Sequence, residues 1–201
     1  MGERDVFVNC PFDGRFEPLF HVIVFTILRC GYQPRCALEA SDAGDTRIAK
    51  IGRIIEECPY GVHDISRVEL DEANGLPRFN MPFELGLFLG AKAFGSKRQA
   101  AKRCLVLERE RYAYQKYLSD IAGQDIFAHG DEANVIAGHV RDFLNHADAA
   151  PLPGVGLIMA NYGTFAGALP KLKAQLGLDD RLSYPDFVWV ASDFVSQDVA
   201  G

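Results

Sequence analysis

Apolar positions follow two different periods along the first 150 residues. Short runs rich in β-branched and aromatic residues predict strands at residues 5–10, 32–38, 60–65, 103–107 and 125–128. Between these runs, apolar residues spaced three and four apart and flanked by capping residues predict helices at residues 16–30, 46–58, 80–94, 114–122 and 131–147.

Strands that alternate with helices predict βαβ crossovers and one parallel sheet with helices on both faces. We therefore expect an α/β, flavodoxin-like domain of about five strands in the order 2-1-3-4-5 over residues 1–150. Pro151, Pro153 and Gly154 mark a junction. Residues 151–201, with a helix near 165–176 and an apolar stretch at 187–195, form an appendage that packs either on the domain or on a second copy of the chain.

Composition narrows the functional classes. A chain of 201 residues with 48% hydrophobic and 24% charged residues buries one core. Its net charge of -6 disfavours non-specific nucleic-acid binding. The cysteines and histidines are scattered without metal-ligand spacing, which argues against zinc and for a reducing, cytoplasmic setting. The longest apolar stretch, 19–28, is too short to span a membrane, and the N-terminus lacks a signal-peptide pattern.

In open parallel sheets, ligands bind beyond the carboxyl ends of the strands. The loop after the first strand carries Cys10, Pro11, Phe12 and Asp13. Phe12 can stack on a base there, or it can be the single core aromatic residue of an ordinary turn. The same loop lacks the Ser/Thr-rich cradle that FMN requires, which argues against an electron carrier.

The third strand leads into Asp64, Ser66 and Arg67. Asp64 can bind ribose hydroxyls and Arg67 a phosphate, or the two can be a turn aspartate and a surface arginine. His63, on the opposite side of the strand from Asp64, is expected in the core, whereas His129 is interpreted as a surface residue. No histidine stands at a recognisable triad position relative to Ser66, so a serine hydrolase is disfavoured.

Glu84 is the most informative residue in the sequence. Its helix, NMPFELGLFLGAKAF, is apolar on every side and is expected to be buried, where a carboxylate is costly unless it is paired or used. With Asn80 as N-cap, the positive helix end favours the ionised form, which can stabilise or attack an oxocarbenium ion. Alternatively, Glu84 caps backbone amides or pairs with an arginine such as Arg67. Gly86 and Gly90 are expected to let this helix approach the sheet closely.

Three segments together resemble a known family. They are FVNCPFD at the end of the first strand, DISR at residues 64–67, and NMPFELGLFLGAK around Glu84. The segment resemblance is to the TIR-like and nucleoside 2-deoxyribosyltransferase-like group of bacterial nucleotide-binding proteins. The resemblance covers residues 5–110. It implies cleavage of an N-glycosidic bond in NAD or a nucleoside, with Glu84 as the catalytic carboxylate and Asp64, Ser66 and Asn80 at the ribose. NAD or a nucleotide would be substrate or ligand, with no further cofactor and no metal.

Two functional hypotheses follow. The first is a nucleotide- or NAD-directed N-glycosidase that uses Glu84. The second is a non-catalytic module that senses a nucleotide or assembles into a homo-oligomer, for which the exposed-looking Tyr162, Phe165 and Trp189 of the C-terminal segment would supply an interface. The run from Glu108 to Arg111 alternates in charge and is interpreted as a solvated strand end.

Overall fold

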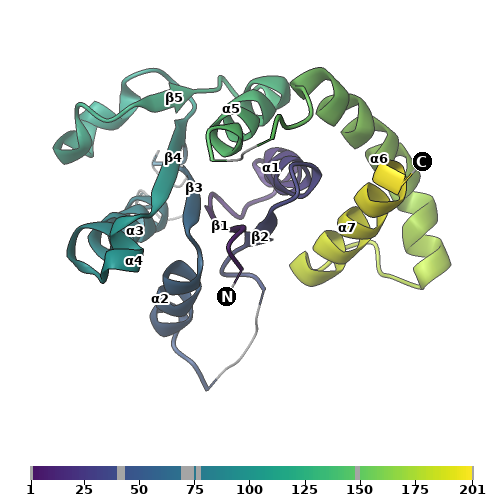
Figure 1. Ribbon diagram of the computed structural model, residues 1–201, viewed down its shortest axis with the longest axis horizontal. Coiled ribbons are helices and arrows are strands. Elements are labelled where there is room, and N and C mark those ends of the chain that lie inside the picture. Colours follow the sequence, from purple (N-terminus) through teal and green to yellow (C-terminus); the bar gives the residue numbers. More distant parts are fainter. Residues whose placement is uncertain (1, 40–43, 69–74, 76–77, 148–149, 201) are drawn as a thin grey trace.

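The computed structural model describes residues 2–39, 44–68, 75, 78–147 and 150–200. Its centre is a five-stranded, all-parallel sheet in the order β2-β1-β3-β4-β5, which confirms the predicted flavodoxin-like topology (Figure 1). The strands are β1 (Asp5–Asn9), β2 (Gln33–Arg35), β3 (Tyr60–Asp64), β4 (Arg103–Glu108) and β5 (Ile126–Ala128).

Helices cover both faces of the sheet, with α1 and α5 on one side and α2 and α3 on the other (Figure 1). Two short 3-10 helices, η1 and η2, replace the single helix predicted at 114–122. Within the described residues, no helix is long and apolar enough to cross a membrane. The helices are α1 (Glu17–Arg29), α2 (Arg47–Glu57), α3 (Asn80–Phe94), α4 (Lys97–Ala100), η1 (Ala113–Lys116), η2 (Ser119–Ile121), α5 (Ala133–Asn145), α6 (Val155–Leu176) and α7 (Tyr184–Ala200).

Strand β2 is shorter than the run at 32–38 predicts. It lies at the edge of the sheet, where Pro34 is tolerated because its missing N–H leaves no interior ladder bond unmade. The Pro34 carbonyl accepts a hydrogen bond from the hydroxyl of Tyr184 in α7, at 2.8 Å. The edge strand is thereby tied to the C-terminal helices.

Helices α6 and α7 pack on α1 and share its hydrophobic core. The ring of Phe25 in α1 stacks on that of Phe165 in α6, with 5.2 Å between the ring centroids. The ring of His21 stacks on that of Phe187 in α7, with 4.0 Å between the centroids. Phe165, expected at the surface, is therefore buried, while Trp189 remains exposed. Helix α6 also begins well before the predicted position 165, because the apolar positions from residue 155 onward continue the face that packs on α1 and α5.

Helix α3 buries one side only, which corrects the expectation that it is enclosed all round. Phe88 is fully buried, but Phe83 and Phe94 are exposed. The close approach to the sheet depends on Gly61 of β3, where an added Cβ would lie 2.9 Å from the Phe88 ring. Added Cβ atoms at Gly86 and Gly90 would meet open space, so the packing role predicted for those glycines is wrong.

Candidate functional site

A set of buried polar side chains gathers where β1, β3 and β4 end. This is the edge at which a parallel sheet binds ligands. The set comprises Asn9, His63, Asp64, Ser66, Glu84, Glu108 and His129.

Asn9 fixes the start of α3 against the end of β1. Its Nδ2 donates to the Met81 carbonyl at 2.8 Å and lies 3.1 Å from Nδ1 of His63. Burial lowers the pKa of His63 to about 3, so the ring is neutral and Nδ1 can accept this bond. His63 thus packs in the core, as predicted, and helps to hold the helix that carries Glu84.

Glu84 lies in the second turn of α3 and is 3% exposed. Its Oε1 is 3.6 Å from Nη2 of Arg47, and its Oε2 is buried without a hydrogen-bond partner in the described part of the chain. Burial raises the pKa of Glu84, and Arg47 lowers it in part. The sequence predicts that the helix N-terminus favours the ionised form, but desolvation is the larger effect.

Arg47 is the partner that sequence reasoning missed when it favoured Arg67. It is the first residue of α2, directly after the N-cap Thr46, whose hydroxyl accepts the Ala49 N–H. Its side chain is half-exposed while reaching Glu84. The signal in the sequence is a basic residue at a helix start on the ligand-binding edge, where cation and helix dipole both favour an anion.

His129 is buried, which contradicts its interpretation as a surface residue. Its Nε2 lies 2.9 Å from Ser66 Oγ and 3.0 Å from Asp64 Oδ2, while Asp64 Oδ1 accepts the Ser66 N–H at 3.0 Å. The Asp64 Oδ2 contact is close but not a well-directed hydrogen bond. His129 comes from the loop before α5, so its proximity to Asp64 depends entirely on the fold.

This cluster is not a nucleophile triad. His129 Nδ1 accepts the backbone N–H of Asp131 at 3.0 Å, so the neutral ring carries its proton on Nε2. The Nε2 atom that would have to accept a proton from Ser66 is therefore the one that bears a proton and faces Asp64. Asp131 makes this bond from a left-handed conformation (φ 60°), which aspartate tolerates.

Glu108 is a second buried carboxylate, and its interpretation as part of a solvated strand end is wrong. Its Oε2 accepts the Tyr114 N–H at 2.6 Å, and its Oε1 accepts the Tyr117 hydroxyl at 2.7 Å. Burial raises the pKa of Glu108 in spite of these bonds. Both oxygens are partnered, so Glu108 has the character of a structural anchor for η1. It borders a cavity of about 320 Å³ that Ser66 also lines.

The loop after β1 lines a larger cavity, of about 610 Å³, through Pro11, Phe12 and Asp13. Asp13 turns the chain into α1, because its Oδ1 accepts the N–H groups of Arg15 and Phe16. Cys10 directly follows β1 and is buried. Burial, with the charges of Asp64 and Glu84 nearby, raises the pKa of its thiol well above the usual value, so the thiol stays protonated.

The remaining predicted site residues, Asn80 and Arg67, are not part of the buried polar set. Asn80 is exposed as the first residue of α3, and the N-cap position falls on Phe79, so the predicted capping role is wrong. Arg67 is half-buried three residues beyond the end of β3, in the segment that carries Ser66. Over the ranges that the structure describes, no three His, Cys, Asp or Glu side chains are arranged to hold a metal ion.

The chain matches no protein-family model, and no curated protein matches its sequence.

Proposed function

We propose that this protein is an N-glycosidase that acts on NAD or a related nucleotide, with Glu84 as the catalytic carboxylate. The observation that carries the proposal is the Glu84 Oε2 atom, which is buried at the ligand-binding edge of the sheet without a hydrogen-bond partner in the described residues. A buried carboxylate oxygen left unbonded destabilises the fold, and such groups concentrate at functional sites.

The chemistry suits this carboxylate. When the bond between C1′ and the base nitrogen breaks, its electron pair leaves with the base and positive charge develops on the ribose. The nicotinamide of NAD is cationic and leaves as a neutral ring without first being protonated. Glu84 in its ionised form stabilises the developing cation, and water then adds to C1′ and releases a proton. Arg47, 3.6 Å from Glu84, is placed to bind an anionic part of the same ligand.

The test is turnover of NAD and a panel of nucleosides and nucleotides by the full chain, with product release followed by chromatography. We expect Glu84→Gln to lower the rate at least 100-fold, because the uncharged amide cannot stabilise the ribosyl cation. The matched control is Glu56→Gln, which removes an exposed carboxylate near the far end of α2. Equal rates for wild type and Glu84→Gln on every substrate would refute the catalytic role.

A second candidate function is a self-assembling module that senses a nucleotide without turnover. One observation favours it: α3 and its N-cap expose the aromatic rings of Phe79, Phe83 and Phe94. Light scattering of the purified chain, with and without nucleotide, tests this function. Concentration-dependent oligomers that disappear in Phe83→Ser, in a protein that binds but does not cleave nucleotides, would establish it in place of the enzyme.

A further inference from the structure

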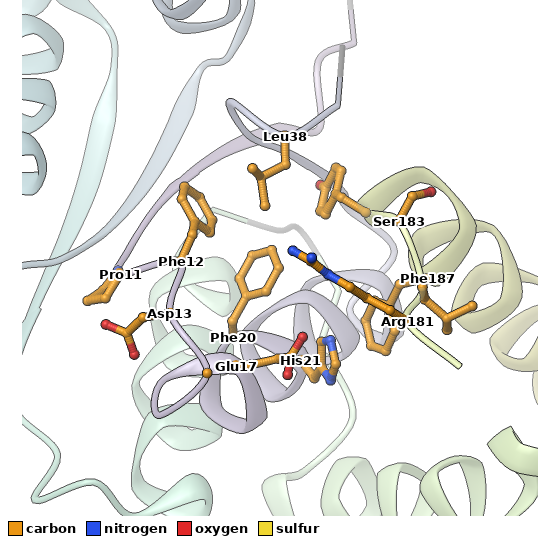
Figure 2. A pocket seen from close by; sticks show the side chains of 13 residues that line it. Pro11, Phe12, Asp13, Glu17, Phe20, His21, Leu38, Arg181, Ser183 and Phe187 are labelled. Carbon is orange, nitrogen blue, oxygen red and sulfur yellow. The ribbon is translucent and has the colours of Figure 1, made fainter. Parts of the chain in front are cut away.

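The 610 Å³ cavity lies between the loop after β1 and the loop that joins α6 to α7 (Figure 2). One wall therefore belongs to the sheet domain and the other to the C-terminal helices. We call it the α1–α7 cavity; its lining includes Phe12, Phe20, Arg181, Tyr184 and Phe187. Its volume is in the range of pockets that hold small molecules and cofactors, roughly 300–1,000 Å³. Glu84 is not part of the lining.

Several aromatic rings line the α1–α7 cavity. Phe12 packs edge-on against Phe20 at 5.3 Å, and Phe20 stacks on Tyr184 at 5.8 Å. Phe12 is only half-buried, so its ring is available to a ligand. Flat aromatic surfaces of this kind bind planar rings such as nucleobases by stacking.

Arg181 places a positive charge in the same space. Its side chain extends from the α6–α7 loop into the cavity (Figure 2). Within the residues that the structure describes, it forms no hydrogen bond or ion pair. Helix α7 starts three residues later, and its capping residue Ser183 also lines the cavity. A free guanidinium beside a helix N-terminus favours an anionic group such as a phosphate.

The opposite side of the cavity carries an acceptor. Asp13 is already engaged by backbone N–H groups and by Arg78 at 3.4 Å. The carboxylate of Glu17, by contrast, makes no hydrogen bond or ion pair with any described residue. It lies next to His21 in Figure 2, and its charge partly offsets the lowering of the pKa of His21 by burial. An exposed carboxylate of this kind accepts hydrogen bonds from sugar hydroxyls.

We propose that the α1–α7 cavity binds one nucleoside phosphate unit. The base lies against Phe12 and Phe20, a ribose hydroxyl donates to Glu17, and the phosphate is held by Arg181. The inference rests on the proposed function in placing a nucleotide at this edge of the sheet. It adds that the C-terminal helices complete the binding site and that this subsite holds a part of the ligand that does not react at Glu84.

Calorimetry on the full chain tests the assignment, with AMP, GMP, CMP and UMP as probes and the matching nucleosides as phosphate-free controls. The Glu84→Gln variant is used throughout, so that turnover does not contribute to the heat. Arg181→Gln is expected to weaken binding of the preferred nucleotide at least tenfold and to leave its nucleoside unaffected. Phe12→Leu is expected to weaken both. Lys171→Gln, which removes an exposed cation on α6 outside the cavity, should change neither.

Three outcomes would overturn the assignment: no nucleotide binds, Arg181→Gln binds the nucleotide as tightly as its parent, or Arg181→Gln weakens nucleoside and nucleotide equally. These results are separable from failure of the proposed function. Nucleotide binding that depends on Arg181, in a protein that releases no base, would remove the N-glycosidase and keep the cavity. If base release depends on Glu84 but Arg181→Gln does not change nucleotide affinity, the N-glycosidase is kept and the cavity assignment is removed.

Discussion

Two features of the structure act on the ionisation of Glu84 in opposite directions. Its burial disfavours the ionised form that the proposed chemistry needs, and Arg47 restores part of that preference. A carboxylate kept for its reactivity at the expense of folding free energy is typical of active sites. We therefore expect substitutions at Glu84 and Arg47 to change both the stability of the fold and the pH dependence of activity.

Glu84→Gln should raise the melting temperature at pH 7–8 by about 2–4 °C, the shift that 1 kcal/mol produces in a chain of this size. A raised pKa means that the folded state holds a proton over a pH range where the unfolded state has lost it. Stability of the wild type therefore falls as pH rises through that range, and glutamine lacks this loss. Scanning calorimetry between pH 4 and 8 should show that the difference in melting temperature between Glu84→Gln and wild type becomes smaller toward pH 4. A lower melting temperature for the variant at pH 8 would indicate a structural role.

Arg47→Gln should shift the acid limb of the activity profile to higher pH. The guanidinium lowers the pKa of Glu84, so its removal lets burial raise that pKa further and delays ionisation. The measurement is kcat/KM from pH 4 to 9 for both proteins. Arg53→Gln is a suitable control, because Arg53 is also in α2 but pairs with Asp45, just before the helix, and not with Glu84. An acid limb at the same pH in both proteins would contradict the assignment to Glu84.

At the scale of elements, the candidate site depends on how α2 and α3 are anchored. Asn9 holds the start of α3, and Gly61 lets its buried face reach the sheet. Lys102, between α4 and β4, closes the end of α2: its Nζ donates to the carbonyls of Ile55, at 2.5 Å, and of Cys58. Lys102 thus anchors the C-terminal end of α2, while Arg47 at its N-terminal end lies beside Glu84.

Lys102→Met should destabilise the fold by about 2–3 kcal/mol, because two buried carbonyls lose their donor while the apolar stem is retained. Urea unfolding followed by circular dichroism measures the loss. Lys97→Met is the control: Lys97 is an exposed lysine of α4, and its loss should fall within about 0.5 kcal/mol of wild type. Equal midpoints for the two variants would show that water replaces the lysine at no cost.

At the scale of the molecule, the C-terminal helices complete both a core and a cavity. They cover α1, whose buried face is shared by the sheet, α5, α6 and α7. Figure 1 shows α6 and α7 beside α1, on the side of the sheet away from α2 and α3. The same packing brings Arg181 to the loop after β1. The C-terminal helices therefore contribute both to the hydrophobic core and to the proposed nucleotide subsite.

Phe165→Ala should cost about 3–5 kcal/mol, because the ring is 1% exposed and packs against Phe25. Trp189→Ala, in α7, provides the contrast: its ring is 57% exposed, and we expect a loss below about 1 kcal/mol. Denaturant unfolding of the full chain measures both. Comparable losses for the two variants would contradict the packing of α6 on α1.

The sequence by itself determined the strand order, the start of α3 at Asn80 and the placement of Glu84 at the ligand-binding edge. The start of α3 follows from periodicity, which acts between near neighbours. The strand order and the edge at which Glu84 lies follow from the alternation of strands and helices, because right-handed βαβ crossovers restrict how such strands can be arranged. Only the tertiary structure decided that His129 meets Asp64, that Arg47 meets Glu84, and that Arg181 enters the cavity beside Phe12. Each of these pairs joins residues at least 37 positions apart in the chain. Such contacts depend on how helices pack across the sheet, and no local pattern of polar and apolar residues encodes that packing.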